Sequence, residues 1–214
     1  MTFRRLAVTA AVAAAVAAVP FTALRAQTYP STPLEKRIKA LTDRLAPELI
    51  EIRRDIHCNP EIGNRLPRTS AIVVDHFRKL GLEVRTGYAE SGVVGILRGG
   101  RPGPVVAMRG DMDALPITEE TGLPFASKVR AVVDGRETGL MHACGHDIHT
   151  TLLLGVASVL AAVRADLPGT VVFVAQPGEE CCDGARLMIA DGAFADPVPE
   201  AFFAYHVDDT LKAG

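Results

Sequence analysis

The densest group of chemically active side chains lies at 142–149, where three histidines, one cysteine and one aspartate occur in eight residues. Such a set is hard to explain as core packing. Cys144 and His146 are two positions apart, and both can point at one metal ion if the backbone turns sharply at Gly145. Thiolate and imidazole ligands favour zinc or a similar divalent ion over calcium. We expect a metal site here, with Asp147 as the N-cap of the helix that follows.

Two pairs of carboxylates each follow an apolar, β-rich run of the sequence. Asp111 and Asp113 come after one run, and Glu179 with Glu180 come after another. The first pair can hold a metal or orient a ligand, although a solvated turn gives the same pattern. In the second pair one carboxylate can bind metal while the other handles protons, as two carboxylates in different environments commonly do. An acidic first turn of the next helix is the alternative for this pair.

His206 follows a third apolar run, at a position where a lone His is more often structural than a ligand. Its place in the order of the groups favours a ligand, because open α/β sheets bind ligands beyond the carboxyl ends of their strands. In chain order the groups supply Cys, His, carboxylate and His, enough for much of a two-metal site. Such a site polarises a carbonyl, lowers the pKa of a bound water and needs a free carboxylate as general base.

Helices and β-rich runs alternate along the chain, which predicts an α/β fold with a largely parallel sheet covered on both faces. Apolar residues at helical spacing predict the helices, and Pro47 kinks the first of them or divides it into two. The polar, turn-rich segment 113–140 predicts a long functional loop. The predicted helices cover 34–56, 69–80, 148–163 and 185–190, and the predicted strands cover 82–85, 93–97, 105–108, 170–175 and 201–205.

The N-terminus has the pattern of a secretory signal peptide. Basic residues precede an apolar run at 6–19, and Ala26 offers a small residue for cleavage. We therefore predict a signal peptide at 1–26 and a mature region at 27–214. A retained membrane anchor is the alternative, although the run is short for a span, which needs about 20 apolar residues. The mature protein is then periplasmic or secreted, without stable insertion in the membrane.

Charge and composition exclude several classes of partner. The net charge of −2 argues against nucleic acid and anionic membranes. Because Trp is absent and only 5% of residues are aromatic, stacking platforms for single-stranded nucleic acid are not expected. An oxidising compartment permits disulfides, but the spacing of the four cysteines does not suggest a disulfide framework. Cys181 and Cys182 are neighbours, which we expect to be hard to join because disulfide geometry is specific.

The candidate groups, taken in chain order, resemble the successive motifs of one protein family. It is the amidohydrolase branch of the aminoacylase/carboxypeptidase G metallopeptidases, which includes hippurate hydrolases and hydrolases of auxin conjugates. The resemblance covers essentially all of the chain after about Pro33. Its motifs are Arg53–His57 with Pro60–Glu61, Asp111–Pro116, Met141–Asp147, Gln176–Glu180 and Tyr205–His206.

The resemblance implies a three-layer, zinc-exopeptidase-like α/β catalytic domain that cleaves the amide bond of an N-acyl amino acid or small peptide. Glu179 is then the general base that activates a metal-bound water and later protonates the leaving amine. Asp113 matches the family's aspartate that orients or tunes the metal site. Two divalent ions, zinc, manganese or cobalt, are held by Cys144, His146, Glu180 and His206.

The remaining polar residues of these motifs are expected to be secondary. Asp111 stands where the wider family has His, so we leave it out of the ligand set. We expect His142 and His149 to support the ligands or the fold, and we assign no role to His57 and His76.

The sequence also departs from the family pattern. Gly178 stands where this branch usually has Ala, Cys181 and Cys182 replace small, Gly-rich residues, and 207–211 lacks the usual Pro. Family members continue into a lid or dimerisation domain and return with a last His ligand. We therefore expect 27–214 to be the N-terminal part of a catalytic domain, incomplete at its C-terminus, and we expect a homodimer only in the full-length protein.

Three functions remain open from the sequence. The first is a metal-dependent amidohydrolase acting through a metal-activated water. The second is a non-catalytic metal-binding relative that kept the ligands. The third is a thiol enzyme with Cys144 as nucleophile near His146, which has little support because a Cys two residues from a His on one turn is better placed to chelate than to attack.

Overall fold

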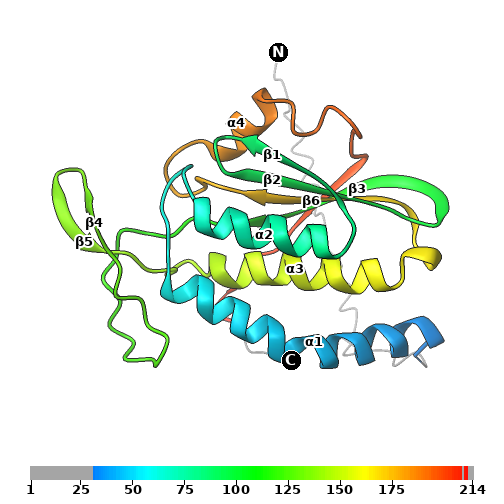
Figure 1. Ribbon diagram of the computed structural model, residues 1–214, viewed down its shortest axis with the longest axis horizontal. Coiled ribbons are helices and arrows are strands. Elements are labelled where there is room, and N and C mark those ends of the chain that lie inside the picture. Colours follow the sequence, from blue (N-terminus) through cyan, green and yellow to red (C-terminus); the bar gives the residue numbers. More distant parts are fainter. Residues whose placement is uncertain (1–30, 209, 212–214) are drawn as a thin grey trace, which may run out of the picture.

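The computed structural model describes residues 31–208 and 210–211, so the predicted signal peptide at 1–26 lies outside the described residues. Helices cover both faces of a five-stranded sheet (Figure 1). The helices are α1 (Pro33–Cys58), α2 (Pro67–Lys79), α3 (His146–Ala162) and α4 (Gly184–Ala190), with a 3-10 turn at Arg164–Asp166. The strands are β1 (Glu83–Tyr88), β2 (Gly92–Arg98), β3 (Arg101–Asp111), β4 (Arg130–Val133), β5 (Arg136–Gly139), β6 (Pro168–Gln176) and β7 (Ala201–Ala204).

The sheet has the order β1-β2-β6-β3-β7, and its two halves differ in strand direction. β6, β3 and β7 pair in parallel, whereas β2 pairs antiparallel with both β1 and β6. The loop between β1 and β2 is only three residues long, and so short a connection permits only an antiparallel pair. The α/β prediction is confirmed, and the parallel half of the sheet is the half that leads into the predicted site.

Alternating side chains of the central strands supply two cores, one on each face of the sheet. Phe173 points to the face covered by α2 and α3, where it contacts Phe77 of α2. Val172 and Val174 point to the opposite face, where Met188 of α4 covers them. α1 packs on the outer side of α3, so the order of layers is α1, then α2 with α3, the sheet and α4 (Figure 1). Both faces of the sheet are therefore buried at its central strands β2 and β6, as their continuous apolar runs require, whereas the edge strand β7 is exposed.

Two local predictions differ from the structure, and a third is narrowed. α1 is one helix that contains Pro47, so of its two alternatives the division into two helices is wrong. The segment predicted as a long loop carries the β4–β5 hairpin, which stands away from the main sheet at one end of the molecule (Figure 1). Asp147 is not an N-cap. α3 begins at His146 after Gly145, whose φ of 87° makes the sharp turn, and Asp147 is the second residue of the helix, with its side chain turned towards α1.

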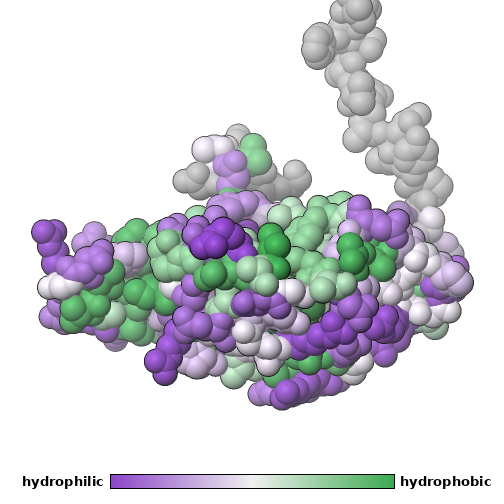
Figure 2. Space-filling model, turned by 90° about the horizontal axis from the view of Figure 1, so that it is seen from above, coloured by the Kyte–Doolittle hydropathy of each residue, from purple (hydrophilic) through white to green (hydrophobic). Residues whose placement is uncertain are grey.

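No helix among the described residues is both long and apolar enough to cross a membrane. Hydrophilic and hydrophobic residues are interspersed over the face that Figure 2 presents.

Candidate metal centre

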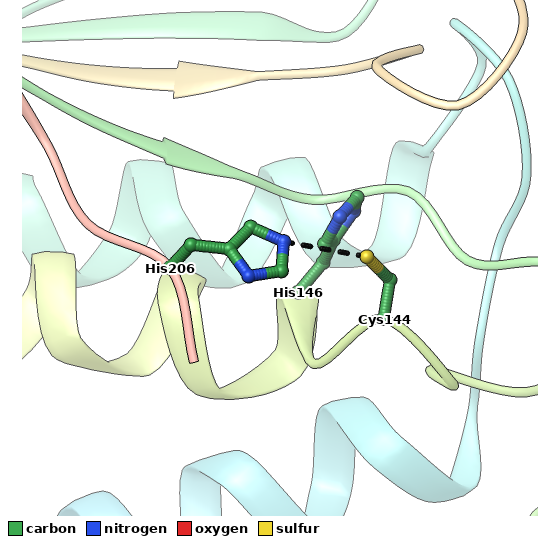
Figure 3. Close-up of side chains that lie close together, drawn as sticks. All are labelled: Cys144, His146 and His206. Atoms are coloured by element: carbon green, nitrogen blue, oxygen red, sulfur yellow. Dashed lines mark hydrogen bonds between the residues drawn. The ribbon is translucent and has the colours of Figure 1, made fainter. Parts of the chain in front are cut away.

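The predicted site residues come from four separate segments that meet at one edge of the sheet. Asp111 is the last residue of β3, and the next residue, Met112, is bonded through its backbone to Gln176, the last residue of β6. The N-terminus of α3 and the segment after β7 lie beside these strand ends. Figure 3 shows Cys144 before α3 and His146 in its first turn, with the side chain of His206 pointing towards both. The carboxyl ends of parallel strands therefore bring distant parts of the sequence together, as open α/β sheets do.

His146 lies at the centre of this cluster and is 1% exposed. Its Nε2 atom is 3.6 Å from Asp111 Oδ2, 3.6 Å from Glu180 Oε1 and 4.0 Å from Glu179 Oε2. The sulfur of Cys144 is 3.4 Å from His206 Nε2. Three groups of possible metal ligands share His146, one with Cys144 and His206, one with Asp111 and His149, and one with Glu179 and Glu180. The candidate ligands are therefore gathered around one imidazole.

The donor atoms of this cluster fit a divalent cation. Glu180 Oε1 and both ring nitrogens of His146 are buried and have no hydrogen-bond partner, whereas Asp111 Oδ2 is paired with Arg109 Nη1 at 2.5 Å. Buried polar atoms in proteins are almost always bonded, and a buried atom left without a partner costs about 1–3 kcal/mol. A bound cation satisfies the acceptor atoms that face one another here. The mixture of sulfur, imidazole and carboxylate donors matches zinc and similar ions.

The electrostatics of the cluster also suit a cation. Burial and the adjacent Glu180 carboxylate raise the pKa of Cys144 to about 11. Burial lowers the pKa of His146, but the carboxylates of Asp113, Asp111 and Glu180 outweigh burial, and the net shift is upward. Without a metal the thiol is therefore protonated at neutral pH and is a poor nucleophile, which argues against the thiol-enzyme alternative. A coordinated metal removes that proton.

Asp113 supports the Glu179–Glu180 turn. Its carboxylate is 1% exposed and accepts the backbone N–H of Glu179 and the backbone N–H of Glu180, each at 3.0 Å. Asp113 Oδ1 also lies 3.5 Å from His146 Nδ1. One buried carboxylate thus orients both the turn that carries the predicted base and the imidazole of a predicted ligand. This geometry agrees with the orienting role that the resemblance implies.

His149 and Asp111 have hydrogen-bond partners that the sequence did not predict. His149 Nε2 accepts the backbone N–H of Val207 at 3.0 Å, so its Nδ1 carries the proton and donates it to Asp111 Oδ1 at 2.7 Å. Tyr205 Oη donates to the carbonyl of His149. Both ring nitrogens are therefore in use. His149 holds the chain on either side of His206, whose Nδ1 donates to the Val207 carbonyl and whose Nε2 faces Cys144.

A buried ionic network behind the site was also missed. His57 is 3% exposed and donates to Asp147 at 2.8 Å and to Glu119 at 3.2 Å. The hydrogen bond to Asp147 has the largest effect and raises the pKa of His57. Burial lowers this pKa, but the bond to Glu119 also raises it, and the net shift is upward. Arg53 Nε lies 2.6 Å from the same Asp147 carboxylate. The network ties α1 to the first turn of α3, next to His146. The motif Arg53–His57 was the only sign of this network in the sequence, because its charged residues had no predicted ion-pair partners.

Two cysteines contradict the expectation from the sequence. Cys181 and Cys182 form a disulfide with each other, with an S–S distance of 2.02 Å. The expectation rested on the specific geometry that a disulfide requires. In the structure Gly178 and Asp183, with φ of 59° and 53°, bend the chain tightly around the pair. Cys58 and Cys144 are not disulfide-bonded.

The structure thus brings all six predicted site residues to one edge of the sheet, and their individual roles stay predictions. His142 lies close behind, with its ring 6.4 Å from that of His57, and neither of its nitrogens is bonded. His76 does not belong to the site. Its ring bonds to Ser158 between α2 and α3.

Comparison with known proteins agrees with this geometry. The chain is 41% identical over 166 residues to IAA-amino acid hydrolase ILR1-like 2 of Arabidopsis thaliana, covering 78% of this chain and 35% of that protein. It is 40% identical over 167 residues to N-acetylcysteine deacetylase of Bacillus subtilis, covering 78% and 41%. The crystal structure of the Bacillus subtilis YXEP protein, described as a dinuclear metal binding peptidase, superposes with a TM-score of 0.69 at 40% identity, covering 81% and 45%.

The chain therefore spans less than half the length of each of these relatives. Residues 107–214, which hold every predicted ligand, match the sequence profile of one family. The resemblance drawn from the motifs is confirmed, and the chain belongs to peptidase family M20/M25/M40.

Proposed function

We propose that this protein is a metal-dependent amidohydrolase that cleaves the amide bond of N-acyl amino acids or small peptides. The observation that carries the proposal is the convergence of one thiol, two imidazoles and two adjacent glutamates at the carboxyl ends of the parallel strands. Two relatives support the substrate class, because one is named for deacetylation of N-acetylcysteine and the other for hydrolysis of IAA-amino acids.

The geometry divides the work between the two glutamates. The side chain of Glu180 is 21% exposed. Its Oε1 atom faces His146 and has no hydrogen-bond partner, which suits a metal ligand. Glu179 has 42% of its side chain exposed and reaches the pocket, which suits the base. Two divalent ions, zinc, manganese or cobalt, supply Lewis acidity and an acidified water when bound. Their ligands are Cys144, His146, Glu180 and His206.

The pocket beside these residues has a size suited to a small substrate. It measures about 400 Å³, within the range of small-molecule sites. Its lining includes Glu179, Glu180, Arg109 and Gln176. Glu179 can take a proton within this pocket and return it to a leaving amine.

Replacing Glu179 with Gln tests the assigned base. The protein, expressed from its own gene, is loaded with zinc, manganese or cobalt and assayed on N-acetyl and N-benzoyl amino acids. Loss of a general base lowers kcat by about 10²- to 10⁴-fold, while metal content stays at the wild-type level because Glu179 is not a ligand. Glu180→Gln and Cys144→Ser are expected to lose metal as well as activity.

Glu51→Gln, at an exposed position on α1, is the matched control and is expected to keep both activity and metal. Wild-type turnover in Glu179→Gln would refute the assigned base. Tight metal binding without hydrolysis of any acyl amino acid or dipeptide would instead favour the non-catalytic metal-binding alternative.

We also propose that the mature protein begins near Gln27 and acts in the periplasm or outside the cell. The pattern of residues 1–26 supports this location. Terminal sequencing of the protein recovered from its native cells tests it, and a mature N-terminus at Met1 in a cytoplasmic fraction would contradict it.

A further inference from the structure

The disulfide between Cys181 and Cys182 directly follows the two glutamates of the proposed site. It belongs to the turn that links β6 to α4 (Figure 1). The backbone N–H groups of Cys182 and Gly184 both donate to the carbonyl of Gly178, at 3.3 and 3.0 Å. The proposed base, the proposed ligand and the disulfide are therefore parts of one short, closed turn.

This turn is held against its neighbours on two sides. Asp113 accepts the two glutamate N–H groups, as described above. On the other side Asn64 Nδ2 donates to the carbonyl of Cys182 at 2.9 Å. Asn64 also packs tightly on Gly178, where an added Cβ would lie 2.0 Å from Asn64 Oδ1. With so little room around the turn, a change at the disulfide is transmitted to the glutamates.

The disulfide is also within reach of other molecules. Cys181 is exposed and lines the same pocket as Glu179 and Glu180. The two cysteines outside the disulfide, Cys58 and Cys144, are only partly exposed. A reagent in the pocket therefore meets the Cys181–Cys182 bond beside the proposed metal ligands.

We propose that Cys181 and Cys182 form a reversible redox site that sets the metal affinity of the adjacent centre. The reaction partner is a small or protein dithiol. One of its thiolates attacks the sulfur of Cys181, the Cys181–Cys182 bond breaks, and Cys182 leaves and takes a proton. The second thiol of the partner then attacks the mixed disulfide, closes a disulfide of its own and releases Cys181 as a thiol. Two electrons and two protons pass to the protein.

Reduction removes a ring that fixes the peptide between the two cysteines. The freed backbone regains conformations that the disulfide excluded, and the carboxylate of Glu180 is held less well towards His146. Loss of an interaction that orients a ligand weakens metal binding by about 10- to 100-fold. The oxidised pair is therefore the state with tight metal binding, which agrees with the oxidising compartment proposed above. The inference rests on the proposed function at one point, because this turn carries the proposed base Glu179 and the proposed metal ligand Glu180.

The test compares metal affinity in the two redox states of the protein expressed from its own gene. A trialkylphosphine reduces the disulfide, because it takes oxygen from water to become the phosphine oxide and leaves two thiols. After anaerobic removal of the phosphine, zinc affinity is measured by competition with a chromophoric chelator, and thiols are counted in denaturant. We expect two additional thiols and zinc affinity at least about 10-fold lower, both reversed by reoxidation.

The double variant C181S/C182S is expected to gain no thiols and to show one affinity before and after the phosphine. C58S, which alters a cysteine on α1, is the matched control and keeps the wild-type response. The inference is overturned if the phosphine releases no additional thiols, or if the two states of the wild-type protein bind zinc equally. Neither measurement needs a substrate, so a protein that shows the switch yet hydrolyses no amide refutes the proposed function alone.

Discussion

At the scale of single residues, His142 illustrates what burial does to an unbonded side chain. It is 4% exposed, neither ring nitrogen is bonded, and burial lowers its pKa from 6.5 to about 4. In the unfolded chain this His binds a proton near pH 6.5, whereas in the folded chain it does so only near pH 4. The unfolded state therefore binds more protons in this window, and the contribution of His142 to stability is lost as pH falls from 6.5 towards 4.

Replacing His142 with Leu, which fills similar space without a titrating group, is expected to remove this acid sensitivity. Between pH 7 and pH 5 the wild-type protein should lose about 2 kcal/mol more of its free energy of unfolding than His142→Leu loses. Urea denaturation at the two pH values measures the difference. An equal loss in both proteins would show that another group titrates in this window.

At the scale of elements, α3 positions the segment after β7 through one histidine. His149 bonds to the Val207 N–H with one nitrogen and to Asp111 with the other, and its carbonyl accepts the hydroxyl of Tyr205. His149→Leu is expected to release the segment around His206 and to weaken metal binding by about 10- to 100-fold. Tyr205→Phe, which removes one of the three bonds, is expected to cost less. Chelator competition measures both, and wild-type affinity in His149→Leu would contradict this account.

The ends of the strands could be predicted from the sequence, whereas contacts between distant elements could not. Apolar runs ending at Met108 and Ala175 predicted strand ends, and parallel pairing of β3 with β6 brought the polar residues after them together. Partners distant in the chain could not be predicted, because periodicity records which face a residue occupies and not what it meets. The sequence therefore predicts an N-cap at Asp147, whereas its carboxylate pairs with Arg53 and His57 of α1. The Cys181–Cys182 bond depends on a tight turn that composition alone does not show.

At the scale of the whole molecule, a bound metal adds a further link between parts of the fold that Asp113 and His149 already hold together. Its proposed ligands come from the start of α3, the turn after β6 and the segment after β7, and of the carboxylates around them Asp111 is paired with Arg109. A ligand that binds only the folded state stabilises it by about 2.7 kcal/mol at 100 times its Kd. Zinc is therefore expected to raise the midpoint of thermal unfolding relative to protein in excess chelator.

That increase should itself depend on pH. The thiol of Cys144, with a pKa raised to about 11, and the imidazole of His146, with a pKa raised from 6.5, must both lose protons to bind metal. Proton competition weakens as pH rises, so the zinc-induced increase should be larger at pH 8.5 than at pH 6.5. Cys144→Ser removes the thiol proton and should flatten this dependence, while Cys58→Ser should leave it unchanged. Equal increases at both pH values in the wild-type protein would show that Cys144 and His146 are not ligands, because a metal that displaces their protons must bind more tightly when those protons are scarce.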